Sequence, residues 1–236
     1  MQEMDDSLRW SDELESFSID GEPACDVPDY LFRAEGRFSE AFWGLAAELT
    51  QLNDFCVMLL TSTQEQLNSL RRNLQKLRLG KERIDTPLGD FTDEMMMMLE
   101  EHIPVWEDTY HFLCRATCLL LLLAFVERSL KMLVETLTES AQPRGGARNR
   151  SQSRIAQYLD VLRKMCGPAF VEPEGIALLD QCRYVRNAFA HGDWDEVRRL
   201  VRDIHLRNTF ASASGLLSAI EGAVWNSVWS EEQKGV

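Results

Sequence analysis

The apolar stretch CLLLLLAFV, residues 118–126, is the part of the sequence that decides the fold. It lies between Arg115 and Glu127 and is far shorter than the roughly 20 apolar residues that cross a bilayer. Residues 105–140 contain no proline or glycine, so one helix of about 35 residues can run through them. We therefore expect a buried central helix rather than a membrane span.

Further helices are predicted on both sides by apolar residues that recur every three or four positions. Before the central helix we expect one or two helices at 38–79 ended by Gly80, a turn at DTPLGD (85–90), and a short helix through the methionines at 95–98 that breaks at Pro104. After it we expect helices at 155–165 with Ser151 or Ser153 as the N-cap, at 173–190, at 194–206 with Asp193 and Glu196 as a capping pair, and at 209–229. No convincing strand or repeat is found, so the predicted fold class is all-α, a helical bundle.

Acidic residues are concentrated at the amino terminus. The net charge is -13, and residues 1–30 contribute -9 of it through ten acids and Arg9. This distribution predicts an acidic flexible tail at 1–29. The apolar spacing after it predicts an N-terminal helical segment (one long helix or a helical hairpin) at 30–90 and a helical bundle at 91–236. The acidic total argues against a general nucleic-acid-binding surface, because phosphate binding needs local positive potential.

The amino terminus and the cysteines bear on the compartment. The first residues, MQEMDDSLRW, lack the basic start and apolar core of an export signal, so a cytoplasmic protein without a membrane partner is expected. The six cysteines are scattered without a pair of CxxC units, which predicts reduced thiols inside helices and no zinc. The four methionines at 95–98 are expected to fill packing space rather than bind metal.

The stretch RYVRNAFAHGDWDE, residues 183–196, carries the candidate site. A helical wheel gives it two faces: a core stripe of Leu178, Cys182, Val185 and Phe189, and an opposite polar face of Arg183, Tyr184, Asn187 and His191. Arg186 lies on the flank, about 140° from His191 if the helix continues. Gly192 can end the helix at residue 190 or 191. The His191 side chain would then no longer be held at the helical angle and could approach Arg186. Alternatively, Arg186 simply pairs with an acid such as Asp180 or Asp193, and His191 caps helix carbonyls.

This stretch resembles the R-x4-6-H motif of HEPN-domain proteins, all-helical bundles that include ribonucleases. Arg186, Asn187 and His191 match the motif, and the resemblance covers about residues 91–229. Glu127 and Lys131 in ERSLK are similar to an E-x3-K element of some members; from spacing alone they form a surface ion pair. Tyr184 is a further supporting candidate.

The motif spacing alone has low specificity. Four histidines and 20 arginines predict about one chance match in a chain of this length. Indeed, Arg198 and Arg199 stand at permitted spacings before His205, which we place inside an amphipathic helix. What distinguishes His191 is the preceding Asn187 and a helix end at Gly192.

The resemblance implies a metal-independent endoribonuclease without a cofactor, in which the RNA's own 2′-hydroxyl attacks the adjacent phosphate. His191 would transfer protons, Arg186 would stabilise charge on phosphorus, and Asn187 would orient either group. It also implies a homodimer with a shared cleft, and a toxin–antitoxin or anti-phage setting. The residues expected to bind RNA are Arg183, Arg198, Arg199, Arg202, Arg144, Arg148 and Arg150.

Regulation and two other function classes follow from the same residues. Members controlled by AMP transfer have a tyrosine two residues after the histidine, where this chain has Asp193, so control by that modification is not expected. The alternatives are control by a protein antitoxin or other regulatory partner, or by a neighbouring domain. One alternative function is a non-catalytic dimerisation or interaction module. Another is an acidic antitoxin or immunity protein whose tail mimics nucleic acid. For the arginines at 144–154, the alternative to substrate binding is that they are solvated.

Overall fold

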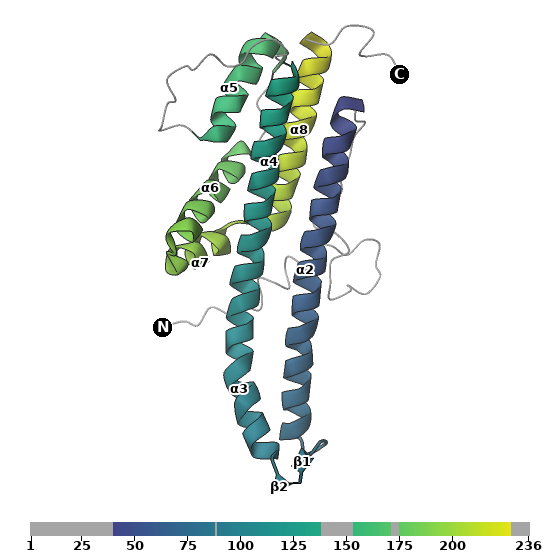
Figure 1. The fold of residues 1–236 in the computed structure, drawn as a ribbon, viewed down its shortest axis with the longest axis vertical. Helices are drawn as coiled ribbons and strands as arrows, with labels where there is room; N and C mark the ends of the chain where they lie inside the picture. Colours follow the sequence, from purple (N-terminus) through teal and green to yellow (C-terminus); the bar gives the residue numbers. More distant parts are fainter. Residues whose placement is uncertain (1–39, 88, 138–152, 171–174, 228–236) are drawn as a thin grey trace. The chain divides into compact units, whose positions relative to one another are not determined.

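The computed structural model describes residues 40–87, 89–137, 153–170 and 175–227, and these are mostly helical (Figure 1). The all-α prediction is confirmed for this part of the chain, while the expected acidic tail at 1–29 lies outside it. The elements are α2 (Glu40–Arg78), β1 (Asp85–Thr86), β2 (Gly89–Asp90), α3 (Thr92–Asp108), the π-helical η1 (Thr109–Cys114), α4 (Arg115–Leu137), α5 (Arg154–Cys166), the 3-10 turn η2 (Gly167–Ala169), α6 (Ile176–His191), α7 (Trp194–Asp203) and α8 (Leu206–Ser227).

Helix α4 is the centre of the larger of two compact units, whose described residues are 40–53, 115–137, 153–170 and 175–227. It contacts α5, α6, α7 and α8, and Figure 1 shows it running between α5–α7 and α8. The predicted apolar run supplies much of its buried face: Cys118, Leu119, Leu122, Leu123, Phe125 and Val126. The expected central helix is therefore confirmed for this unit.

The apolar character of the central helix also satisfies a length-and-hydropathy test for a membrane span. Within the helical run Thr92–Leu137, an 18-residue stretch has a mean hydropathy of 1.7, and 65% of that stretch is buried inside the fold. Burial of that extent is expected of a core helix, because a lipid-facing helix would leave its apolar surface uncovered. The helix therefore gives only weak support for membrane insertion.

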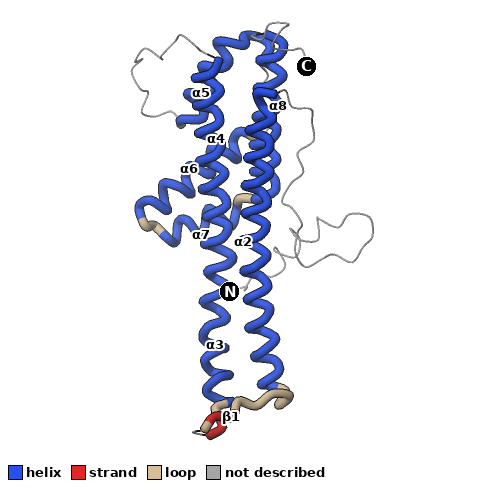
Figure 2. The backbone as a smooth tube through the Cα atoms, turned by 45° about the vertical axis from the view of Figure 1, so that its right-hand side comes forward, coloured by secondary structure: helices blue, strands red, loops and turns tan. Residues whose placement is uncertain are grey.

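The smaller unit, with described residues 54–87 and 89–114, is a pair of helices joined by a turn. Figure 2 shows α2 and α3 side by side, with the strand pair at the turn between them. Arg71 pairs with Glu107 at 2.5 Å, and Arg78 pairs with Glu100 at 2.7 Å. Gly80, at φ 62°, ends α2 as predicted, because glycine adopts this left-handed conformation without steric cost.

The predicted helix break at Pro104 and the predicted helix start at residue 105 are wrong. Pro104 lies inside α3, although it has no N–H to donate to the preceding turn. Buried Leu99 and Ile103, and the two ion pairs to α2, hold the helix on both sides of the proline. The backbone hydrogen bonds change from the α-helical to the π-helical pattern only after the proline, in η1.

The region around residue 90 also differs from the expectation. Two short strands were not predicted: Asp85 pairs with Asp90 and Thr86 pairs with Gly89 in an antiparallel ladder. The turn-forming residues of DTPLGD account for it, because they bring the two ends of the segment together. The boundary expected between residues 90 and 91 falls inside the smaller unit. The turn joins two helices that pack together, so it does not separate two units.

The predicted core-facing side of α6 is correct, but two of the four residues predicted to be buried there are not. The buried residues are Leu179, Cys182, Val185 and Ala188, whereas Leu178 and Phe189 are only partly buried. Because α6 packs against α4, α7 and α8 together, several neighbours set its buried face, and a wheel cannot resolve adjacent positions. Burial raises the pKa of the Cys182 thiol to about 12, so it stays neutral in the core.

Candidate functional site

The site region begins at the junction of α6 and α7, which is built by backbone hydrogen bonds. Gly192 N–H donates to Phe189 O at 3.1 Å, and Asp193 N–H donates to Ala188 O at 3.0 Å, which together form a Schellman motif. Asp193 then caps α7, because its carboxylate accepts from Glu196 N at 3.2 Å. The predicted helix end and N-cap are confirmed, and His191 is the last residue of α6.

Gly192→Ala should destabilise the protein by about 1 kcal/mol, because Gly192 has φ 70° and an alanine there is strained. The free energy of unfolding in urea measures this. Gly215→Ala is the matched control: it lies within α8, and an added Cβ meets nothing within 4 Å. That variant should gain about 0.5–1 kcal/mol, the usual helix preference for alanine over glycine. Equal changes in both variants would contradict the assigned helix end.

The polar face of α6 is exposed as predicted. Tyr184, Asn187 and His191 are exposed, and they follow one another along one side of the helix. Among the described residues, neither Asn187 nor His191 has a hydrogen-bond or ion-pair partner for its side chain. Arg183 packs over the Tyr184 ring at 5.1 Å and pairs loosely with Asp180, at 3.4 Å. This leaves Asn187 and His191 accessible to a ligand.

Arg186 is held by a carboxylate from the central helix. Its Nη1 donates to Oε1 of Glu127 at 2.8 Å, and the Glu127 side chain is only 13% exposed. Arg186 therefore pairs with an acid, as the alternative interpretation expects, but the acid is Glu127 rather than Asp180 or Asp193. The expected ion pair between Glu127 and Lys131 is wrong. Lys131 lies 3.7 Å from Glu135, which has the same four-residue spacing but a more exposed carboxylate.

Arg186 and His191 do not converge within one chain. Because α6 stays helical through His191, the two side chains leave the helix about 140° apart and roughly 7.5 Å apart along its axis. The possibility that His191 lies on a turn beyond the helix is thus excluded. The structure brings Glu127 to Arg186 but leaves His191 on a different side of α6.

The arginines of α7 are mostly paired within their own helix. Arg198 lies 3.2 Å from Asp195, and Arg199 lies 2.6 Å from Glu196. The hydrogen bond between the latter two lowers the pKa of Glu196 and raises the pKa of Arg199. Arg202 is exposed. With three acids and three arginines, α7 carries no net charge, so it gives less positive potential than the sequence suggested.

His205 does not lie inside a helix, which corrects the expectation for the competing motif. It lies in the link between α7 and α8, and its carbonyl accepts from Thr209 N at 3.0 Å and from Thr209 Oγ1 at 2.8 Å. Ile204 in the same link is buried, and its carbonyl accepts from the buried Arg115 at 2.9 Å. This bond fixes the link, so α7 ends at Asp203 instead of extending to about residue 206 as predicted.

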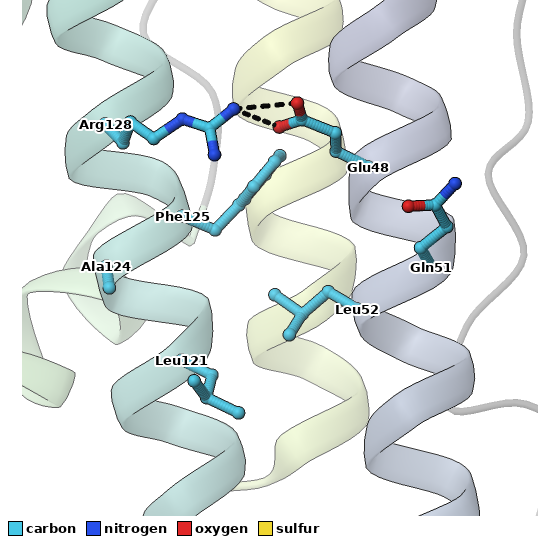
Figure 3. Close-up of a pocket in the computed structure, with 7 residues that line it drawn as sticks. All are labelled: Glu48, Gln51, Leu52, Leu121, Ala124, Phe125 and Arg128. Carbon is cyan, nitrogen blue, oxygen red and sulfur yellow. Dashed lines mark hydrogen bonds and ion pairs between the residues drawn. The ribbon is translucent and has the colours of Figure 1, made fainter.

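A groove elsewhere in the larger unit contains none of the predicted site residues. Glu48, Gln51 and Leu52 of α2 and Leu121, Ala124, Phe125 and Arg128 of α4 line it. Figure 3 shows Arg128 and Glu48 paired at one end, above the side chains of Leu52 and Leu121. Nowhere in the described ranges do three His, Cys, Asp or Glu side chains form a group that could hold a metal ion. Arg144, Arg148 and Arg150 lie outside the described residues.

One residue near Arg186 was considered from the sequence only as one of the arginines at 144–154, without a role of its own. Arg154, the first residue of α5, approaches Oε2 of Glu127 at 3.8 Å. The available signal was its position: a helix N-terminus favours acids, and here it begins with an arginine. Ser153, one of the two predicted caps, accepts from Ala156 N at 3.2 Å.

Comparison with family models, curated proteins and solved structures gave no significant match.

Proposed function

We propose that the protein is an endoribonuclease that cleaves RNA through attack of the 2′-hydroxyl, with Arg186, Asn187 and His191 as its site. The observation that carries the proposal is the pairing of Arg186 with Glu127. A largely buried carboxylate holds one guanidinium nitrogen, and the other N–H groups stay available to a phosphate. The exposed His191 and Asn187 lie on the same helix.

The chemistry suits these side chains. The 2′-oxygen forms a bond to phosphorus as an imidazole takes its proton, and the bond from phosphorus to the 5′-oxygen breaks as that oxygen receives a proton. The products are a 2′,3′-cyclic phosphate and a 5′-hydroxyl. Arg186 stabilises the additional negative charge on the phosphate oxygens during this step. Because the nucleophile belongs to the RNA, the reaction requires no metal-bound water.

The geometry of α6 supports a site shared by two copies of the chain. Arg186 and His191 leave α6 in different directions, so a phosphate held by Arg186 of one copy can meet His191 of the second. In-line attack also places the 2′- and 5′-oxygens on opposite sides of phosphorus. Two copies supply two imidazoles, one to take a proton and one to give a proton.

A non-catalytic interaction module is the second candidate. The observation that favours it is the internal charge pairing of α7, which leaves that helix neutral. In this case Arg186 and Glu127 serve only to join α6 to α4, and α6 pairs with a partner through its polar face.

Purified protein incubated with total cellular RNA in excess EDTA distinguishes the two. The ribonuclease proposal predicts cleavage that persists in EDTA and a dimer by light scattering. A dimer that leaves RNA intact, with and without divalent cations, would support the interaction module. A protein that is monomeric at the concentration of the assay and still cleaves RNA would refute the shared site.

A further inference from the structure

Three charged side chains from three helices meet beside the candidate site. Glu127 of α4 lies between Arg186 of α6, at 2.8 Å, and Arg154 of α5, at 3.8 Å. The two arginines approach different oxygens of the carboxylate, Oε1 and Oε2 respectively. Glu127 thus brings two cationic groups from separate elements to the same place.

Both arginines keep hydrogen-bond donors for another anion. A guanidinium has five N–H donors, and Arg186 donates one of them to Glu127. The distance from Arg154 to Glu127 exceeds that of a hydrogen bond, so this contact is electrostatic only. The side chain of Arg186 is 39% exposed and that of Arg154 is 64% exposed, against 13% for Glu127. One carboxylate offsets one of two positive charges, and the cluster remains cationic.

The position of Arg154 adds to the positive potential. It is the first residue of α5, whose first turn contains no acid. The N-terminus of a helix carries partial positive charge, so an arginine there is unfavourable unless an anion is nearby. Glu127 is nearby but already bonded to Arg186. An additional anion would therefore interact favourably with Arg154, with Arg186 and with the helix end.

We propose that Arg154 and Arg186, bridged by Glu127, form a binding site for the phosphate backbone of RNA. Arg154 binds the phosphate adjacent to the one that Arg186 holds. This assignment rests on the proposed function for the identity of the ligand. It makes Arg154 a binding residue, whose loss weakens RNA binding rather than the chemical step.

The test uses a fluorescent single-stranded RNA in which every ribose carries a 2′-O-methyl group, so that it cannot be cleaved. Arg154→Ala should weaken binding by about tenfold, the usual loss for a hydrogen bond to a charged group. The slope of log affinity against log salt should fall by about 0.7, as one phosphate contact to a single strand is lost. Arg154→Lys should keep most of the slope, since it keeps the charge.

Arg163→Ala is the matched control, because Arg163 is on the same helix and pairs with Asp160 within it, at 3.0 Å. It should leave both the affinity and the slope unchanged. Equal affinity and slope for wild type and Arg154→Ala would overturn the phosphate site, as would a wild-type protein that binds no RNA. Melting temperatures of the variants identify any loss caused by unfolding.

Cleavage of unmodified RNA separates this inference from the proposed function. If binding depends on Arg154 but wild type cleaves nothing, the phosphate site stands and the ribonuclease proposal fails. If wild type cleaves RNA and Arg154→Ala has unchanged KM and kcat, the phosphate site fails and the ribonuclease proposal stands. A raised KM with unchanged kcat supports both.

Discussion

His191→Ala should lower the rate of RNA cleavage by a factor of about 10²–10⁴, the usual contribution of general acid–base catalysis. Histidine is the side chain that titrates near neutral pH, and no other histidine lies on the α6 segment that carries Arg186 and Asn187. The exposed side chain has no partner within the described residues, so its removal should leave the stability nearly unchanged. Single-turnover cleavage of RNA in EDTA measures the effect.

His205→Ala is the control for this experiment. His205 is also exposed and also follows arginines at the motif spacing, but it lies in the link between α7 and α8. The bonds from Thr209 go to its backbone carbonyl, which alanine keeps. Cleavage should therefore remain at the wild-type rate. An equal loss in both variants, or none in His191→Ala, would remove His191 from the site.

Arg186→Ala should reduce cleavage by a factor of about 10²–10³, the range seen when one donor to a developing negative charge is removed. Arg186→Lys should retain part of the rate, because it keeps the charge but loses the forked donors. Measurement of kcat under saturating RNA separates this effect from weaker binding.

Arg128→Ala provides a closely matched control for Arg186. Arg128 is an exposed arginine of the larger unit that, like Arg186, pairs with a glutamate from another helix, in this case Glu48, at 2.6 Å. The Arg128–Glu48 pair is exposed on both sides, so Arg128→Ala should change the free energy of unfolding by less than about 1 kcal/mol. Arg186→Ala leaves the largely buried Glu127 carboxylate without its hydrogen bond and should cost about 1–3 kcal/mol, so the rates are compared at a temperature where both variants are folded. Loss of activity in both variants would show that a general loss of surface charge or packing, rather than the site, is responsible.

Local signals in the sequence were sufficient for the helix ends around the site. Gly192 ends α6, Asp193 caps α7 and Ser153 caps α5, because each of these effects depends on a few neighbouring residues. The buried helix at 118–126 was equally predictable from its unbroken apolar character. These features required no knowledge of which helices pack together.

Features that depend on contacts distant in sequence could not be predicted. Glu127 and Arg186 are 59 residues apart, so their pairing was not visible, whereas Lys131 stood at an attractive local spacing. Pro104 was expected to end a helix that pairing with α2 maintains. His205 was predicted to lie in a helix, whereas it lies in the link between α7 and α8. The hydrogen bond that fixes this link comes from Arg115, 89 residues from Ile204, so it could not be seen in the local sequence.

The central claim, attack by the RNA's own 2′-hydroxyl, is tested most directly by a single atom of the substrate. An RNA that the protein cleaves in EDTA is resynthesised with one 2′-deoxyribose on the 5′ side of the cleaved bond. We expect the unmodified RNA to give a 2′,3′-cyclic phosphate and a 5′-hydroxyl, and the deoxy substitution to abolish cleavage at that bond. Cleavage that continues at the deoxy position, or products with a 5′-phosphate, would contradict the mechanism.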